Sequence, residues 1–209
     1  ILGGFSFSGG IGQMKRAVLG AFIYIAIENV LFFSGLSSFY QYIIQGAISR
    51  GVSVSKYQQD IDWNAVAADD VSFTFIRMGY VDDLDPYFDT NMKEAAAAGL
   101  QVGTYLYSQA LTVEDAMKEA QFAVRTAKDY KISYPIAMDV ESKVITDAGL
   151  TKQQLTDIVN AFCKTVQDAG FHPIVFSYND WLVNKMDTTQ IPYDIWYARY
   201  GTINSYPNR

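Results

Sequence analysis

Residues 135–141 read Pro-Ile-Ala-Met-Asp-Val-Glu, a short apolar run that ends in two carboxylates. Stretches with apolar residues at helical spacing flank this run, one over 112–127 and one over 151–169. Short apolar strands between amphipathic helices favour a parallel sheet, because each helix returns the chain to the same edge of the sheet. The stretch therefore predicts an α/β fold, either a barrel or an open doubly wound sheet.

The same alternation continues on both sides of this central strand. β-Branched and aromatic runs predict further strands over residues 51–54, 71–79, 101–107, 173–178 and 194–200. A helix is expected over 86–98, ended by Gly99, and Thr112 is expected to cap the helix that follows it. Cys163 falls on the apolar face of the 151–169 helix, which favours a packing role over a nucleophilic one.

Asp139 and Glu141 are the first candidates for chemistry. Residues two apart on a strand share a face, and sites in α/β folds lie at the carboxyl ends of strands. Repulsion and desolvation should raise the pKa of one of these carboxyls, as an acid catalyst near neutral pH requires. A chance Asp-x-Glu that caps a helix or lies on the surface is the alternative.

Arginine and aromatic residues end the other predicted strands. Aromatic rings near carboxylates suit carbohydrate, because sugar C–H faces stack on π surfaces and tyrosine hydroxyls reach sugar hydroxyls. Each aromatic taken alone is equally compatible with core packing. The candidate substrate-binding residues at these strand ends are Arg77, Tyr80, Tyr105, Tyr107, Tyr178, Trp196 and Tyr200.

Composition limits the other classes of function. The chain has 209 residues, half of them apolar, which is enough for one sizeable core. The net charge of −6 comes from the part after residue 50, so nucleic acid is not an expected partner. One cysteine and one histidine, His172, make a metal site of the usual ligand types improbable.

Residues 1–50 differ in composition from the rest. Residues 17–36 are almost unbroken apolar sequence, long enough for one transmembrane helix, although Glu28 and Asn29 interrupt it. A signal peptide and a buried core helix are the alternatives. Residues 2–48 resemble the C-terminal part of ribose-type sugar transporter permeases, through the Gly-Gly-Phe-Ser-Phe-Ser-Gly-Gly loop and the Ser38-Phe39-Tyr40-Gln41 segment. A fusion or junction near residue 50 is therefore expected, with one domain over 1–50 and another over 51–209.

The second part resembles glycoside hydrolase family 25, the cell-wall muramidases. The resemblance runs from Gly51 to about Gly201 and rests on motifs that occur in family order. They are Gly51 to Gln58, Asp60-Ile61-Asp62-Trp63, Phe75-Ile76-Arg77, Asp85-Pro86-Tyr87-Phe88, Asn91, Ala98-Gly99-Leu100, Val102-Gly103, Tyr105 to Ser108, Asp139-Val140-Glu141 and Ile195-Trp196 to Tyr200.

The resemblance implies a fold and a reaction. The fold would be an irregular TIM-like (β/α) barrel, and the reaction would cleave the β-1,4 bond from N-acetylmuramic acid to N-acetylglucosamine in peptidoglycan. Glu141 matches the family's general acid, and Asp139 matches the carboxylate that steadies the acetamido group or the developing positive charge. Retention and inversion both remain open. No metal or organic cofactor is implied.

Two departures from the family pattern are visible. Ser53 stands where the family usually has Asp, so substrate positioning or water activation lacks a fixed charge. The chain stops at Arg209, before the family's closing strands, so a barrel lacking its last strands is expected. A binding module that holds peptidoglycan without cleaving it, and a transport component residing in residues 1–50, are the two competing functions.

Partners and location follow from the same two parts. The expected partner is the peptidoglycan glycan strand, with a membrane contact through residues 17–36 and a monomeric state. Lys15 and Arg16 before the apolar stretch favour a cytoplasmic N-terminus. The hydrolase would then lie outside the cell, facing the wall and tethered to the membrane.

Overall fold

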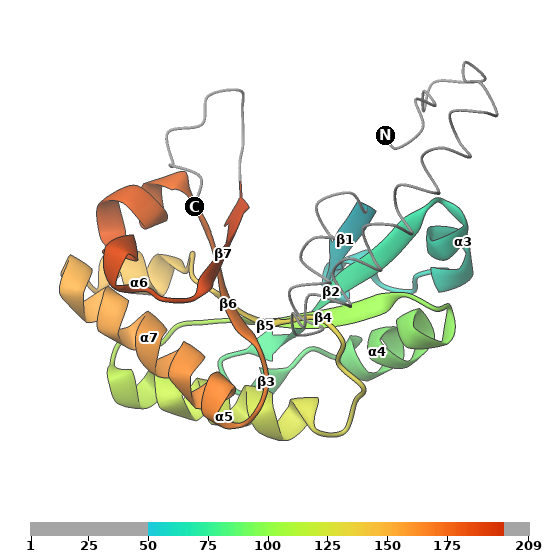
Figure 1. The fold of residues 1–209 in the computed structure, drawn as a ribbon, viewed down its shortest axis with the longest axis horizontal. Coiled ribbons are helices and arrows are strands. Elements are labelled where there is room, and N and C mark those ends of the chain that lie inside the picture. The colour runs from blue at the N-terminus through green and yellow to red at the C-terminus, as the bar shows by residue number, and fades with distance from the viewer. Residues whose placement is uncertain (1–49, 199–209) are drawn as a thin grey trace, which may run out of the picture. The chain divides into compact units, whose positions relative to one another are not determined.

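The computed structural model describes residues 50–198, which form a curled, mostly parallel sheet with helices on one side (Figure 1). The strand order is β1-β2-β4-β5-β6-β7, and the short β3 pairs antiparallel with β2. Parallel pairings join β2 to β4, β4 to β5, β5 to β6 and β6 to β7. The strand bounds are Arg50–Val54, Val71–Tyr80, Asp83–Leu84, Gln101–Tyr107, Ile136–Asp139, Pro173–Tyr178 and Asp194–Ala198.

The helices connect consecutive strands, as the alternation in the sequence predicts. Among them, α5 begins after Thr112, whose hydroxyl accepts from Asp115 N–H, and α7 begins at a capping box of Thr151 and Gln154. The helices are α3 Trp63–Ala68, α4 Phe88–Ala97, α5 Val113–Ala127, α6 Lys143–Asp147 and α7 Lys152–Asp168. Single turns occur at Lys56–Gln58, Trp181–Lys185 and Thr188–Gln190.

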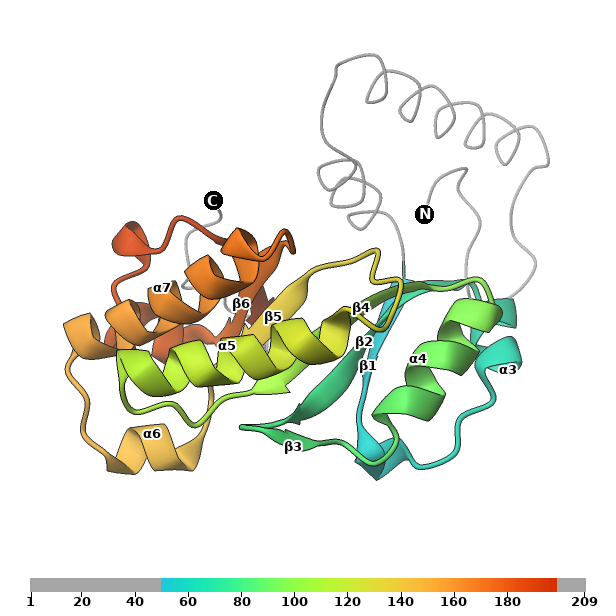
Figure 2. The same cartoon turned by 90° about the horizontal axis from the view of Figure 1, so that it is seen from below.

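The convex face of the sheet carries the main core. Alternate strand residues such as Ile76, Leu106 and Met138 point to this face and are fully buried. Helices α4, α5 and α7 cover it, and Figure 2 shows them lying across one side of the strands. Cys163 on α7 is fully buried in this core, so the expected packing role is confirmed.

The concave face carries a second, smaller core. Phe75, Ala137 and Ile174 are buried here, and Phe73, Tyr105, Tyr134, Phe176 and Trp196 pack against them. Phe75 on β2 contacts Trp196 on β7 with ring centroids 4.5 Å apart, although these strands are not neighbours in the sheet. Only a strongly curled sheet brings such rings together, so the described strands form a half-barrel.

The prediction of an α/β fold is confirmed. An α/β architecture with a curled parallel sheet is present, and the described residues extend around half of the expected TIM-like barrel. The central strand is shorter than predicted, because β5 ends at Asp139 and Glu141 lies two residues beyond it.

The apolar stretch 17–36 and Tyr200 lie outside the described residues. Within 50–198 no helix is long and apolar enough to cross a membrane.

Candidate active site

The candidate site lies where the parallel strands end on the concave face. Strand register places Tyr107 beside Asp139, and Asp139 beside Phe176. The same row continues from Phe176 to Trp196 on β7. Because residues in register on parallel strands point to the same face, the row sets one carboxylate among three aromatic rings.

Backbone contacts hold the chain in place just after β5. Val140 donates its N–H to the carbonyl of Phe176 at 2.9 Å, and its own carbonyl accepts from the Ser177 hydroxyl at 2.6 Å. Val140 is fully buried on the side of the main core. Glu141 is therefore kept near the strand end, half-buried, rather than released into a loop.

Asp139 is a buried carboxyl whose pKa lies well above its usual range. Burial raises its pKa to about 8, with a further contribution from the repulsion of Glu141 that Arg77 partly offsets. Burial also raises the pKa of Glu141. Within residues 50–198, no group donates a hydrogen bond to Asp139 Oδ1. The charge of Glu141 therefore acts on Asp139, the more deeply buried of the two carboxyls.

Ser53, Tyr105 and Arg77 form the next part of the site. The Tyr105 hydroxyl donates to the carbonyl of Val54 at 3.4 Å and hydrogen-bonds the Ser53 side chain. Burial raises the pKa of Tyr105, and the nearby positive charge of Arg77 acts against this rise. These interactions join β1, β2 and β4 at their carboxyl ends.

Tyr80 and Tyr107 form a stacked pair. Their rings lie 5.7 Å apart and nearly parallel, at the ends of the paired strands β2 and β4. The Tyr107 hydroxyl also hydrogen-bonds Ser142, and the charges of Asp139 and Glu141 act on it. Tyr80 is largely exposed, so the pair offers an aromatic edge beside the carboxyls.

Two other predicted site residues, Trp196 and Tyr178, are half-buried and contact other aromatic rings. Trp196 lies between Phe75 and Phe176 in the concave-face core, at 4.5 and 4.7 Å between ring centroids. Tyr178 contacts the buried Trp181 edge-on at 6.3 Å. Strand ends alone did not distinguish these aromatics from those beside the carboxyls, because the distinction depends on which rings the curl brings together.

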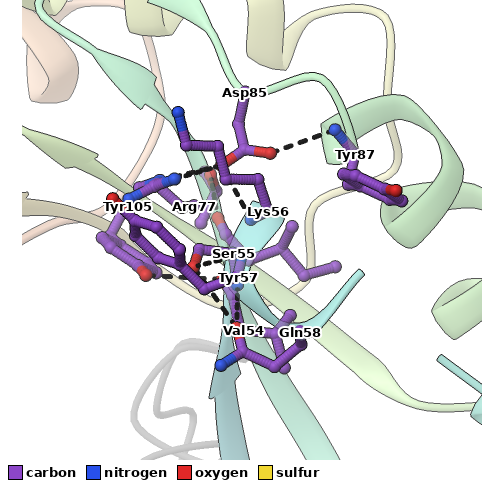
Figure 3. A network of polar contacts seen from close by, with 11 residues as sticks. Val54, Ser55, Lys56, Tyr57, Gln58, Arg77, Asp85, Tyr87 and Tyr105 are labelled. Carbon is purple, nitrogen blue, oxygen red and sulfur yellow. Dashed lines mark hydrogen bonds and ion pairs between the residues drawn. The ribbon is translucent and has the colours of Figure 1, made fainter. Parts of the chain in front are cut away.

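Asp85 was missed as a site residue by sequence reasoning. Its buried carboxylate accepts from Arg77 Nε at 2.8 Å, from Lys56 N–H and from Tyr87 N–H (Figure 3). Arg77 Nη2 also lies 2.7 Å from Asp85 Oδ2. Asp85 opens the motif Asp85-Pro86-Tyr87-Phe88, but no local sequence pattern indicates that the Asp85 carboxylate pairs with Arg77 on β2.

Glu119 on α5 is a second missed residue. It is buried and accepts from the Ser108 hydroxyl at 2.6 Å and from Gln109 N–H at 3.0 Å. Gln109 in turn donates to Ser142 at 3.1 Å. Glu119 thus holds the segment after β4 against the segment after β5, where Tyr107 and Glu141 lie. The sequence did contain a signal for its burial, because Glu119 lies at helical spacing among the apolar residues of α5.

No group of three or more potential metal ligands of the His, Cys, Asp or Glu type occurs within residues 50–198. The clustered groups of the site are carboxyls, phenols and a guanidinium already paired to Asp85. This set suits proton transfer to a neutral polyhydroxylated substrate.

Comparison with known proteins agrees with this geometry. The profile of Glycosyl hydrolases family 25 matches residues 52–209, about three-quarters of the chain. The chain belongs to this family. The resemblance seen in the motifs from Gly51 onward is thereby confirmed.

Individual relatives share the same region. The chain is 26% identical over 163 residues to the autolytic lysozyme of Clostridium acetobutylicum, covering 76% of this chain and 47% of that protein. It spans about half the length of the curated relatives of this family that it matches. Solved structures with a similar fold include the modular autolysin LytC of Streptococcus pneumoniae in complex with a synthetic peptidoglycan ligand, at TM-score 0.69 and 24% identity. That match covers 76% of this chain and 39% of LytC.

A further structure is a family 25 glycosyl hydrolase from Bacillus anthracis, with TM-score 0.60 and 25% identity over 70% of this chain and 68% of that one. A different similarity concerns a short stretch. Over 48 residues the chain is 42% identical to the xylose transport system permease protein XylH of Escherichia coli, covering 23% of this chain and 12% of the permease. This agrees with the permease resemblance of residues 2–48.

Proposed function

We propose that this family 25 chain hydrolyses the β-1,4 bond between N-acetylmuramic acid and N-acetylglucosamine in peptidoglycan, with Glu141 as general acid. The observation that carries the proposal is the carboxyl pair Asp139 and Glu141, held at the end of β5 beside stacked Tyr80 and Tyr107. Membership of a glycosyl hydrolase family and the likeness to an autolytic lysozyme support it.

Glu141 has the properties that a proton donor needs. Its raised pKa keeps a larger share of the carboxyl protonated near neutrality. In the proposed step, Glu141 transfers this proton to the glycosidic oxygen while the bond from that oxygen to the anomeric carbon breaks. The same carboxylate then takes a proton from the attacking water, which restores the starting state.

Asp139 suits a different task. Its Oδ1 is a buried acceptor without a donor among the described residues, and the acetamido N–H of the substrate would supply one. A hydrogen bond donated to the carboxylate favours its charged form, so substrate binding should lower the pKa of Asp139. The ionised Asp139 would then orient the acetamido oxygen toward the anomeric carbon and stabilise the positive charge that develops there.

The remaining parts of the chain fit an enzyme that acts at the wall. We propose two domains, 1–50 and 51–209, and a monomer that works outside the cell. The apolar composition of residues 17–36 supports a membrane tether, and Lys15 and Arg16 before it support this orientation. Extraction of membranes with carbonate and with detergent tests the tether, since release by carbonate alone contradicts it.

A binding module is the second candidate, and Ser53 is the observation that favours it. A hydroxyl replaces the family's usual carboxylate there, beside Tyr105. In that case the groove would still hold glycan, and turnover would be lost. The two candidates make different predictions for the same assay.

Dye release from labelled peptidoglycan tests the proposal, with the full chain and the variants Glu141→Gln and Glu94→Gln. Glu94 is an exposed residue of α4 on the outer side, so its variant is the matched control. We expect Glu141→Gln to lose roughly 10²–10⁴-fold in rate and Glu94→Gln to remain unchanged. A folded chain that binds the labelled wall without releasing dye supports the binding module instead. Equal rates for Glu141→Gln and the unaltered chain contradict the catalytic role.

A further inference from the structure

We infer that Tyr57 is a sugar-stacking platform that extends glycan binding beyond the two carboxyls, a step that rests on the proposed function. Tyr57 lies just after β1, in the short 3-10 turn Lys56–Gln58. It is 75% exposed, the most exposed large hydrophobic residue among those described. A single exposed ring is ordinary on a protein surface, so the inference rests on the contacts that hold this ring in place.

The turn that carries Tyr57 is fixed at both ends. Ser55 and Gln58 form a capping box, with Ser55 N–H donating to Gln58 Oε1 at 2.8 Å and Tyr57 N–H donating to the Ser55 hydroxyl at 3.4 Å. Lys56 N–H donates to the buried carboxylate of Asp85 at 3.0 Å. These contacts leave the backbone of the turn little freedom (Figure 3).

Arg77 contributes to the position of the ring itself. Its guanidinium carbon lies 5.1 Å from the centroid of the Tyr57 ring, within the range of a cation–π contact. Arg77 is in turn held by the same Asp85 that anchors the turn. The ring is therefore oriented before any ligand arrives, which lowers the entropy lost on binding.

Tyr57 belongs to the same cluster as the carboxyls. The positive charge of Arg77 acts on Asp139 and on Tyr105. Tyr105 also hydrogen-bonds Ser53 and the carbonyl of Val54, the last residues of β1 before the turn. Tyr57 is thus joined to the candidate site through Arg77, which contacts its ring and acts on Asp139.

The chemistry of this arrangement fits one saccharide unit of a glycan strand. An aromatic face stacks against the C–H face of a sugar ring, and the phenol can hydrogen-bond its hydroxyl or acyl groups. The Lys56 ammonium lies 5.7 Å from the centroid of the Tyr57 ring, so it is a second donor beside the same sugar. Since the ring is joined to Asp139 through the side chain of Arg77, we place it against a saccharide unit other than the two that flank the cleaved bond. Its contribution should therefore appear only with longer strands.

Binding measured in an uncleaving background tests this inference separately from catalysis. The full chain carrying Glu141→Gln is titrated with soluble peptidoglycan glycan fragments of two and of six or more saccharide units. Tyr57→Ala, Tyr57→Phe and Met117→Ala are added to this background one at a time. Met117 is an exposed residue of α5, so it controls for loss of exposed apolar surface elsewhere.

We expect Tyr57→Ala to weaken binding of the long fragment roughly fivefold to tenfold and to leave the two-unit fragment unchanged. Tyr57→Phe should keep the affinity because the ring remains, and Met117→Ala should have no effect. Equal affinities of Tyr57→Ala and its parent for the long fragment overturn the platform. If Glu141→Gln proves not to affect turnover, yet Tyr57→Ala still weakens the long fragment, the catalytic assignment fails and the platform stands.

Discussion

Phe75 and Trp196 contact each other across the concave face, with ring centroids 4.5 Å apart, although three strands lie between β2 and β7 in the sheet order. Phe176 adds a second contact to Trp196 at 4.7 Å. Phe176 and Trp196 continue the register row of Tyr107 and Asp139, so the curl of the sheet and the shape of the site depend on the same packing.

Trp196→Ala should therefore destabilise the half-barrel. Complete burial makes a Trp→Ala change cost about 3–5 kcal/mol, and the partial exposure of Trp196 places the expected loss near ~2–3 kcal/mol. Trp196→Phe should recover more than half of it, because a ring still fills the space. Urea unfolding measures both, with Val183→Ala as a surface control expected within ~0.5 kcal/mol. A loss no larger than the control's contradicts the packing role.

Asp139→Asn should stabilise the protein in a pH-dependent way. The folded-state pKa of about 8 exceeds the unfolded value of about 3.9, so the folded state binds the proton more tightly. Below about pH 4 both states are protonated and the carboxyl causes no loss of stability. Between about pH 4 and pH 8 the unfolded state ionises first, so the free energy of unfolding of the unaltered chain falls as the pH rises.

The stability gained by Asp139→Asn should thus be close to zero at pH 4 and on the order of a few kcal/mol at pH 8. Urea midpoints at pH 4, 6 and 8 measure this gain, with the unaltered chain at each pH as the reference. A gain that is the same at all three pH values would show that Asp139 titrates normally.

Asp85→Asn should be among the more damaging polar substitutions. The carboxylate is 1% exposed at its side chain, and its loss leaves the largely buried guanidinium of Arg77 without a counter-charge. Breaking such a pair costs about 3 kcal/mol or more. Asp168→Asn, which breaks the exposed pair with Lys164, should cost less than ~1 kcal/mol. Thermal or urea unfolding of the two variants side by side makes the comparison, and similar losses would contradict the importance of Asp85.

Ser53→Asp should raise the rate of dye release at least severalfold, because it adds a fixed negative charge beside the Tyr105 hydroxyl. Ser53→Asn has the same size without the charge and should give no such gain. Initial rates over pH 4–8 measure the effect. A rate for Ser53→Asp equal to or below that of Ser53→Asn would mean that the serine is not what limits turnover.

Local pattern was sufficient for most of the regular structure. The bounds predicted for 101–107 and 173–178 agree with β4 and β6, and Thr112 and Thr151 cap α5 and α7. These features depend on alternation, helical spacing and capping side chains, all of which act over a few residues. The same local reasoning singled out Asp139 and Glu141, because two carboxyls at the end of an apolar run are costly wherever the strand lies.

Residue types and short spacings in the chain thus predicted the longer strands, the three longest helices and the paired carboxyls, but not the short elements α3, α6 and β3. The curl of the sheet brought Trp196 against Phe75, whereas Tyr107 stacks on Tyr80, although Trp196 and Tyr107 belong to the same register row. Folding also joined Asp85 to Arg77 and to the turn that carries Tyr57. Burial set the pKa of Asp139, because desolvation depends on all the elements packed around a group and not on its neighbours in sequence.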